Sequence, residues 1–72
     1  GIGAVQKLDL SFNKTESLPA DAFIALPNLR GINLEQNMLH TIHPDAFRGL
    51  NNLEYLILRN NNLENVDLTI FN

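Results

Sequence analysis

The feature that most constrains the fold is an internal repeat of 24 residues. When the sequence is shifted by this length, apolar residues align with apolar residues and Asn aligns with Asn. The aligned columns include Val5/Leu29/Leu53, Leu8/Ile32/Leu56, Leu10/Leu34/Leu58, Asn13/Asn37/Asn61, Leu18/Ile42/Val66 and Phe23/Phe47/Phe71. The units 1–24, 25–48 and 49–72 account for all 72 residues, so we expect a single domain, 1–72, of three stacked repeats.

Each unit combines a short strand with a longer return segment. Apolar and polar residues alternate over 8–10 and 32–34, and this period of two predicts a strand with one buried face. The aligned segment 56–58 is predicted to form the same strand, with Ile57 at the outward position. Pro19, Pro27 and Pro44 fall outside these strands. One unit cannot bury its apolar side alone, so stacking should place the strands in a parallel sheet with the return segments opposite.

An Asn follows each strand at a fixed offset and predicts an internal ladder. Asn13, Asn37 and Asn61 come three residues after the second apolar residue of their strands. A turn that leads inward removes backbone groups from water, and an Asn amide offers two donors and an acceptor to satisfy them. The alternative is that the three are surface turn residues, but the constant offset favours a buried ladder.

The motif Leu-x-x-Leu-x-Leu-x-x-Asn-x-Leu-x-x-Leu, followed by Phe-x-x-Leu, resembles the leucine-rich repeat. The unit length and the Asp45-Ala46-Phe47 return are similar to extracellular animal members such as Toll-like receptors, Slit-type guidance proteins and insect immune proteins. The resemblance implies an α/β right-handed solenoid, a horseshoe segment with three short parallel strands on its concave face and extended or 3₁₀ segments on its convex face. It also implies an extracellular or cell-surface receptor that binds a protein ligand on the concave face, without catalysis.

The sequence departs from this family at Thr15, which takes the place of a Leu, and in having no cysteine-rich caps. Without caps, the outer faces of the first and last repeats have no cover, because each repeat depends on its neighbours. We therefore expect a fragment of a longer protein. The alternative function is a structural one, in which the chain forms homo-oligomers end to end through its hydrophobic ends.

The outward positions of the strands form the candidate binding surface. They make a grid with rows Lys7, Asp9 and Ser11, then Gly31, Asn33 and Glu35, then Tyr55, Ile57 and Arg59. Tyr and Arg are common at binding hot spots, and we expect Tyr55 and Ile57 to be exposed apolar residues. The alternative is that one exposed Tyr and one exposed Ile are ordinary surface residues. Glu35 and Arg59 are expected to pair across neighbouring strands.

Composition excludes several other classes of function. The chain has 5 Lys and Arg against 8 Asp and Glu, so it lacks the basic charge of a nucleic-acid binder. No apolar run reaches the roughly 20 residues of a membrane span. There is no Cys, and His40, His43 and Asp45 lie in a return segment rather than on one helical face, so we predict no metal site. No catalytic set or cofactor motif is present, and we predict a protein that is not an enzyme and has no cofactor.

Two further residues leave alternatives open. Asn13-Lys14-Thr15 is an N-glycosylation sequon, but the predicted burial of Asn13 in the ladder favours no glycan. The alternative is that Thr15 marks a real sequon in a loosened first turn. Phe12 has polar column partners, and it either flanks the concave edge or folds over the uncovered first repeat.

Overall fold

The computed structural model describes residues 1–63 of the chain. Val66 and Phe71, which belong to the repeat columns, lie outside the described residues. The elements are a 3₁₀ turn η1 (Ile2–Ala4) and the strands β1 (Lys7–Asp9), β2 (Ser17–Leu18), β3 (Gly31–Asn33), β4 (Thr41–Ile42) and β5 (Tyr55–Ile57).

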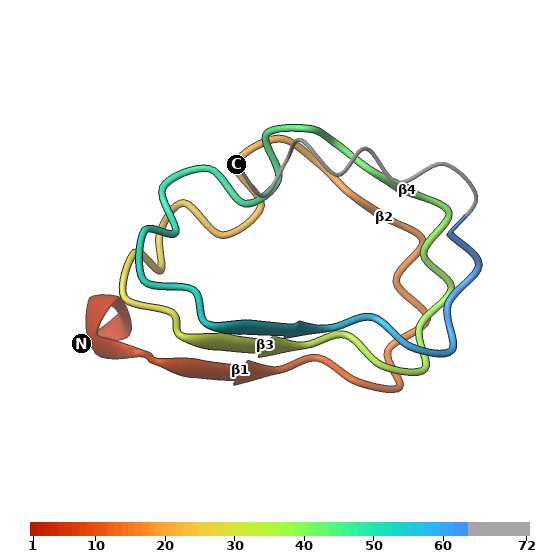
Figure 1. Cartoon of the computed structure of the whole chain (residues 1–72), viewed down its shortest axis with the longest axis horizontal. Helices are drawn as coiled ribbons and strands as arrows, with labels where there is room; N and C mark the ends of the chain where they lie inside the picture. Colours follow the sequence, from red (N-terminus) through yellow and green to blue (C-terminus); the bar gives the residue numbers. More distant parts are fainter. Residues whose placement is uncertain (64–72) are drawn as a thin grey trace.

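The main sheet contains β1, β3 and β5, in that order, and all its strands run parallel (Figure 1). Its register pairs Lys7 with Gly31 and Tyr55, and Leu8 with Ile32 and Leu56. Partners are therefore 24 residues apart, which confirms the predicted set of three short parallel strands. Residues that align in the 24-residue repeat therefore lie side by side on neighbouring strands and form one row across the sheet.

The return segments of the first two repeats pair with each other in a second, smaller sheet, which was not predicted. β2 pairs in parallel with β4, and the Leu18 carbonyl also accepts the His43 N–H at 2.9 Å. Beyond these strands the chain forms turns closed by short bonds such as Ala46 N–H to His43 O, 2.9 Å. No α-helix occurs within residues 1–63, so the α part of the expected α/β class is wrong for that part of the chain. These turns are too short to recover the cost of nucleating a helix.

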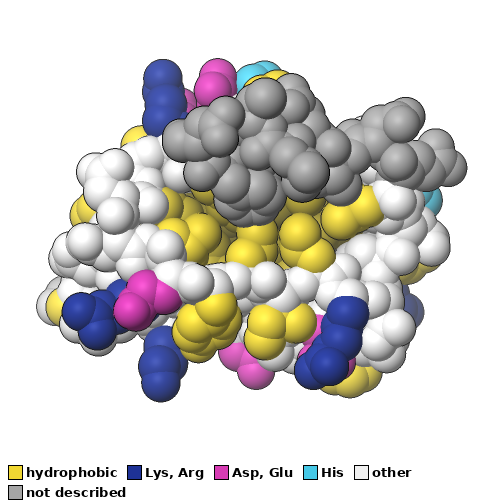
Figure 2. Space-filling view, in the orientation of Figure 1, with side chains coloured by type: hydrophobic (Ala, Val, Ile, Leu, Met, Phe, Trp, Pro, Cys, Tyr) yellow, Lys and Arg dark blue, Asp and Glu magenta, His cyan; other side chains and the backbone are white. Residues whose placement is uncertain are grey.

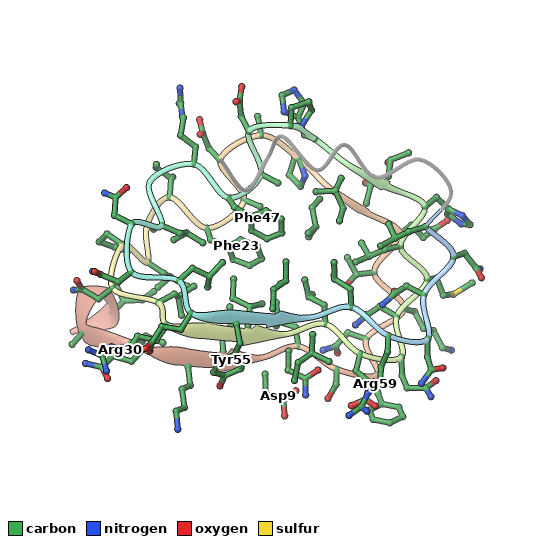
Figure 3. The ribbon with its side chains drawn as sticks, viewed as in Figure 1. Asp9, Phe23, Arg30, Phe47, Tyr55 and Arg59 are labelled. Atoms are coloured by element: carbon green, nitrogen blue, oxygen red, sulfur yellow. The ribbon has the colours of Figure 1, made fainter. Side chains whose placement is uncertain are left out.

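The core lies between the two sheets. Its largest fully buried side chains are Leu29, Ile32, Leu34 and Leu39, all from the second repeat. Phe23 and Phe47 point into the interior and stack with ring centroids 5.9 Å apart (Figure 3). The equivalent apolar residues on either side, in the first and third repeats, are only half-buried: Val5, Leu8, Leu10, Leu53, Leu56 and Leu58.

Candidate functional site

The side of the main sheet that faces away from the core is called the strand face. It is formed by Lys7, Asp9, Ser11, Gly31, Asn33, Glu35, Tyr55, Ile57 and Arg59. Asp9, Tyr55 and Arg59 all lie on the side of the ribbon away from the core (Figure 3). In the space-filling view, apolar, basic and acidic side chains gather along this edge of the molecule (Figure 2). The strand face therefore presents mixed chemistry in a small area.

Tyr55 lies across the middle strand, over Gly31. A methyl group added to Gly31 would overlap Cζ, Oη and Cε1 of the Tyr55 ring. Gly31 is buried in consequence, whereas Tyr55 remains 44% exposed. Gly31 was predicted only as one outward position of the grid, and its contact with Tyr55 was not predicted. A usable signal was present, because a glycine inside a strand often marks a close approach by another group.

The exposure predicted for Ile57 is wrong, because this side chain is half-buried. Ile57 pairs with Asn33 on the neighbouring strand. Tyr55 and Arg59 lie two residues before and after it, and alternate residues of a strand share one face. Tyr55 is 44% exposed, so it offers more of its surface to a partner than the half-buried Ile57 does.

The predicted pair between Glu35 and Arg59 is confirmed. Arg59 Nε lies 2.8 Å from Glu35 Oε2, and the Arg59 side chain is 69% exposed while that of Glu35 is 23% exposed. An exposed pair of this kind contributes about 0.2–1 kcal/mol, so its main effect is to hold the guanidinium in place. Lys7 makes no ion pair with any residue of the described range.

Asp9 and Asn33 close the same turn in successive repeats. Asp9 Oδ1 accepts the Ser11 N–H at 2.9 Å and the Ser11 hydroxyl at 2.6 Å. The hydroxyl bond, followed by the backbone bond, lowers the pKa of Asp9. Asn33 Oδ1 accepts the Glu35 N–H at 2.9 Å. The side chains of Asp9, Ser11 and Asn33 are thus already held by bonds within their own turns.

The residue before each Asn of the ladder has a left-handed backbone. The φ angles are 60° at Phe12, 57° at Gln36 and 61° at Asn60. Phe12 is 72% exposed, so the alternative in which it folds over the first repeat is wrong. The Phe12 N–H donates to Glu35 O at 3.0 Å, and this bond joins the turn of the first repeat to that of the second.

Asn37 bridges two repeats through five hydrogen bonds and is 6% exposed. Its Oδ1 accepts the N–H groups of Asn13 and Thr15, and its Nδ2 donates to the carbonyls of Leu10, Leu34 and Glu35. Asn61 is half-buried and accepts the Leu39 N–H at 3.0 Å. Both side chains therefore satisfy backbone groups of the preceding repeat.

The expectation that Asn13 is buried is wrong, because its side chain is exposed. Its Nδ2 donates only within its own turn, to Leu10 O at 2.9 Å and Ser11 O at 3.3 Å. No group within residues 1–63 donates to its Oδ1. Asn37, by contrast, accepts from two N–H groups of the first repeat, those of Asn13 and Thr15.

The described residues contain no group of three side chains able to hold a metal ion. His43 Nδ1 accepts the Asp45 N–H at 3.0 Å, so that nitrogen closes a turn. None of the helical segments within 1–63 is long and apolar enough to cross a bilayer. An open hollow of about 380 Å³ beside β5 is lined by Leu53, Glu54, Tyr55, Leu56 and Leu58.

Comparison with known proteins agrees with the repeat geometry. A family model described as leucine rich repeat matches residues 4–63, which include all five strands. A search of the curated proteins finds no match.

Proposed function

Because the chain belongs to the leucine-rich repeat family, we propose that it is a non-catalytic recognition module that binds a protein partner through its strand face. Domains of this family generally mediate protein–protein interaction. In this proposal the strand face is the concave side of a right-handed, horseshoe-shaped solenoid. The likeness of the 24-residue unit to extracellular members supports an extracellular or cell-surface location, and a receptor role such as innate immune recognition.

The observation that carries the proposal is the position of Tyr55. Its ring lies against Gly31 and yet remains 44% exposed. A ring that already lies against the sheet loses little freedom when a partner covers it, and Tyr is a residue type enriched at binding hot spots. Tyr55 is therefore the proposed apolar anchor of the interface.

Charged groups around this anchor define the partner chemistry. Lys7 has no ionic partner among the described residues, and it lies in the same row as Tyr55, with Gly31 between them. Asp9 and the Glu35–Arg59 pair lie further along the strands. We propose a partner surface with an apolar centre and both signs of charge at its rim, the usual organisation of protein interfaces.

The test is a binding screen of the chain against a panel of purified secreted proteins and ectodomains. Tyr55→Ala combined with Ile57→Ser should weaken any specific hit at least about tenfold, since truncation of a hot-spot residue costs about 2 kcal/mol or more and about 1.4 kcal/mol is a factor of ten. Ile24→Ser is the matched control, because Ile24 is 51% exposed but lies in a return segment. Equal affinities for the double variant and the control would exclude the strand face.

A second candidate function is self-association through the open sides of the stack. Among the described strands, β1 pairs only with β3. The apolar residues in and next to β1 are half-buried, whereas their counterparts in the second repeat are fully buried: Val5, Leu8 and Leu10 against Leu29, Ile32 and Leu34. An unpaired strand edge with apolar residues beside it can pair with a second chain. Sedimentation over a concentration series should then give a mass that rises with concentration, also in the Tyr55→Ala/Ile57→Ser variant. A constant monomer mass would exclude this candidate.

A further inference from the structure

Phe12 is the most exposed aromatic residue in the described part of the chain, with 72% of its surface accessible. Within residues 1–63 its ring takes no part in the core or in an aromatic stack. The exposure belongs to the position in the repeat, because Gln36 occupies the same position beyond the middle strand, which is paired on both sides, and is exposed as well. Asn60 in the third repeat is also exposed. Phe12 is thus the one apolar residue in an exposed polar column.

The backbone of Phe12 is a second, independent observation. Its φ of 60° is left-handed, as are the φ angles of Gln36 and Asn60. Asn adopts this conformation readily, whereas a bulky aromatic residue is strained there. Burial does not offset the strain, because the ring is exposed. Strain of this kind clusters at binding sites, and Phe is a residue type enriched at protein interfaces.

Hydrogen bonds place Phe12 at one corner of the strand face. Its N–H donates to Glu35 O at 3.0 Å, so Phe12 directly follows the row that contains Glu35 and Arg59. That row lies four residues beyond the row of Tyr55, about 13 Å along the strands, and β1 is two strands from β5, about 10 Å across the sheet. Phe12 and Tyr55 are therefore at least roughly 16 Å apart, at opposite corners. An interface that covers both spans the whole strand face.

The charge next to Phe12 indicates what a partner carries at this corner. In the Glu35–Arg59 pair the cation is the outer member, since the Arg59 side chain is 69% exposed and that of Glu35 is 23% exposed. Arg59 lies on the side of the ribbon away from the core, at the far end of the strand face from Tyr55 (Figure 3). A guanidinium has five N–H donors and one carboxylate engages two of them, so Arg59 can bind a second carboxylate.

We propose that Phe12 is a second anchor of the interface, which enters an apolar contact on a protein partner that also presents a carboxylate to Arg59. The inference rests on the proposed recognition function and names the partner chemistry at the corner away from Tyr55. It explains why the first repeat carries a Phe where Asn would give the more stable turn, since binding residues are often retained at a cost in stability.

The probe for this inference is a library of random peptides displayed on phage and selected on the 72-residue chain. Selected peptides should combine a large apolar residue with an Asp or Glu. Their affinity for Phe12→Asn should be at least about tenfold lower, the size of effect expected at a hot spot. Gln36→Asn is the matched control, because it places the same residue at the same left-handed position and should leave the affinity unchanged. Both variants should melt at least as high as the wild-type chain, so unfolding cannot account for lost binding.

Peptides that bind Phe12→Asn as tightly as the wild-type chain, or a library that yields no binder, would overturn the inference. Peptides weakened by Tyr55→Ala/Ile57→Ser but not by Phe12→Asn would leave the strand face as the binding site and remove Phe12 from it. Peptides affected by neither change would exclude the proposed function as well. Arg59→Gln should weaken the acidic peptides but not their Asn or Gln counterparts, and an equal effect on both would overturn the assigned carboxylate.

Discussion

The first and second repeats carry the same pattern but differ in how much of it is buried. In the second repeat Leu29, Ile32, Leu34 and Leu39 are fully buried and Asn37 is 6% exposed. In the first repeat the equivalent residues Val5, Leu8, Leu10 and Thr15 are half-buried and Asn13 is exposed. Within residues 1–63 the strand of the second repeat pairs with a strand on each side, whereas that of the first repeat pairs with the second repeat only. Burial in this molecule is therefore a property of the stack rather than of the single repeat.

The largest expected contrast is between Asn37→Leu and Asn13→Leu. Loss of Asn37 leaves the backbone N–H groups of Asn13 and Thr15 without an acceptor, and three carbonyls each lose one of their two donors. Each buried group left unpaired costs about 1–3 kcal/mol, so the total should reach about 3–5 kcal/mol and unfold much of the population. Asn13→Leu removes two exposed bonds and should cost less than about 1.5 kcal/mol.

Urea denaturation followed by circular dichroism measures both variants. A control for the hydrophobic gain is Asn62→Leu, since Asn62 is exposed and belongs to no ladder position. Equal loss of stability at Asn13 and Asn37 would mean that the two ladder positions are equally buried in solution, and would contradict the difference in burial between the first and second repeats.

The next contrast is between Leu39→Ala and Thr15→Ala in one apolar column. Leu39 is 0% exposed, and truncation of such a residue removes transfer free energy and leaves a cavity. The expected cost is about 2–5 kcal/mol. Thr15 is half-buried and its hydroxyl has no partner among the described residues, so its truncation should cost less than about 1 kcal/mol. Similar shifts of the urea midpoint would show that the first repeat packs as tightly as the second.

These contrasts show how far the sequence could predict the fold. The strands followed from alternation at Leu8, Ile32 and Leu56, because side-chain period and repeat length are both local properties. The exposure of Asn13 did not follow, because it depends on a neighbouring repeat rather than on the residue. The contact of Tyr55 with Gly31 depends on a side-chain rotamer, which a period cannot specify.

Backbone strain is a feature that the first and second repeats share, at Phe12 and Gln36. Both residues have left-handed backbones, as does Asn60 in the same column. This conformation costs most L-residues about 1–2 kcal/mol, whereas Asn adopts it readily. Phe12→Asn should therefore stabilise the chain by up to about 1 kcal/mol, since 72% of the Phe surface is exposed and little burial is lost.

Thermal denaturation of Phe12→Asn and Gln36→Asn provides the measurement. The two gains should be similar, because the backbone angle is shared and both side chains are exposed. A loss of stability for Phe12→Asn alone would indicate that the Phe12 ring packs in solution.

A substitution at Gly31 in the middle strand is compared with one at Lys7, which lies in the same row on the first strand. Gly31→Ala forces the Tyr55 ring to turn away, because the added methyl would overlap it. The ring is the outer end of a rotatable side chain, so the cost should be about 1 kcal/mol or less. Tyr55 is the single Tyr and there is no Trp, so intrinsic fluorescence reports this ring alone. Lys7→Ala, in the same row, is the control and should leave the emission unchanged.

The smallest effect concerns the turn that Asp9 and Asn33 close in the same way, one with a charge and one without. Hydrogen bonds from Ser11 lower the pKa of Asp9 below its ordinary value of 3.8, so the folded state favours the carboxylate. The stabilisation is fully present above the unfolded pKa and is lost as the pH falls through the folded pKa. Ser11→Ala should raise the Asp9 pKa toward 3.8, which a carboxyl NMR titration measures directly. Asp9→Asn should keep the turn, as Asn33 does, but remove this part of the acid dependence. An Asp9 pKa that is the same with and without the Ser11 hydroxyl would mean that the hydroxyl bond is not formed in solution.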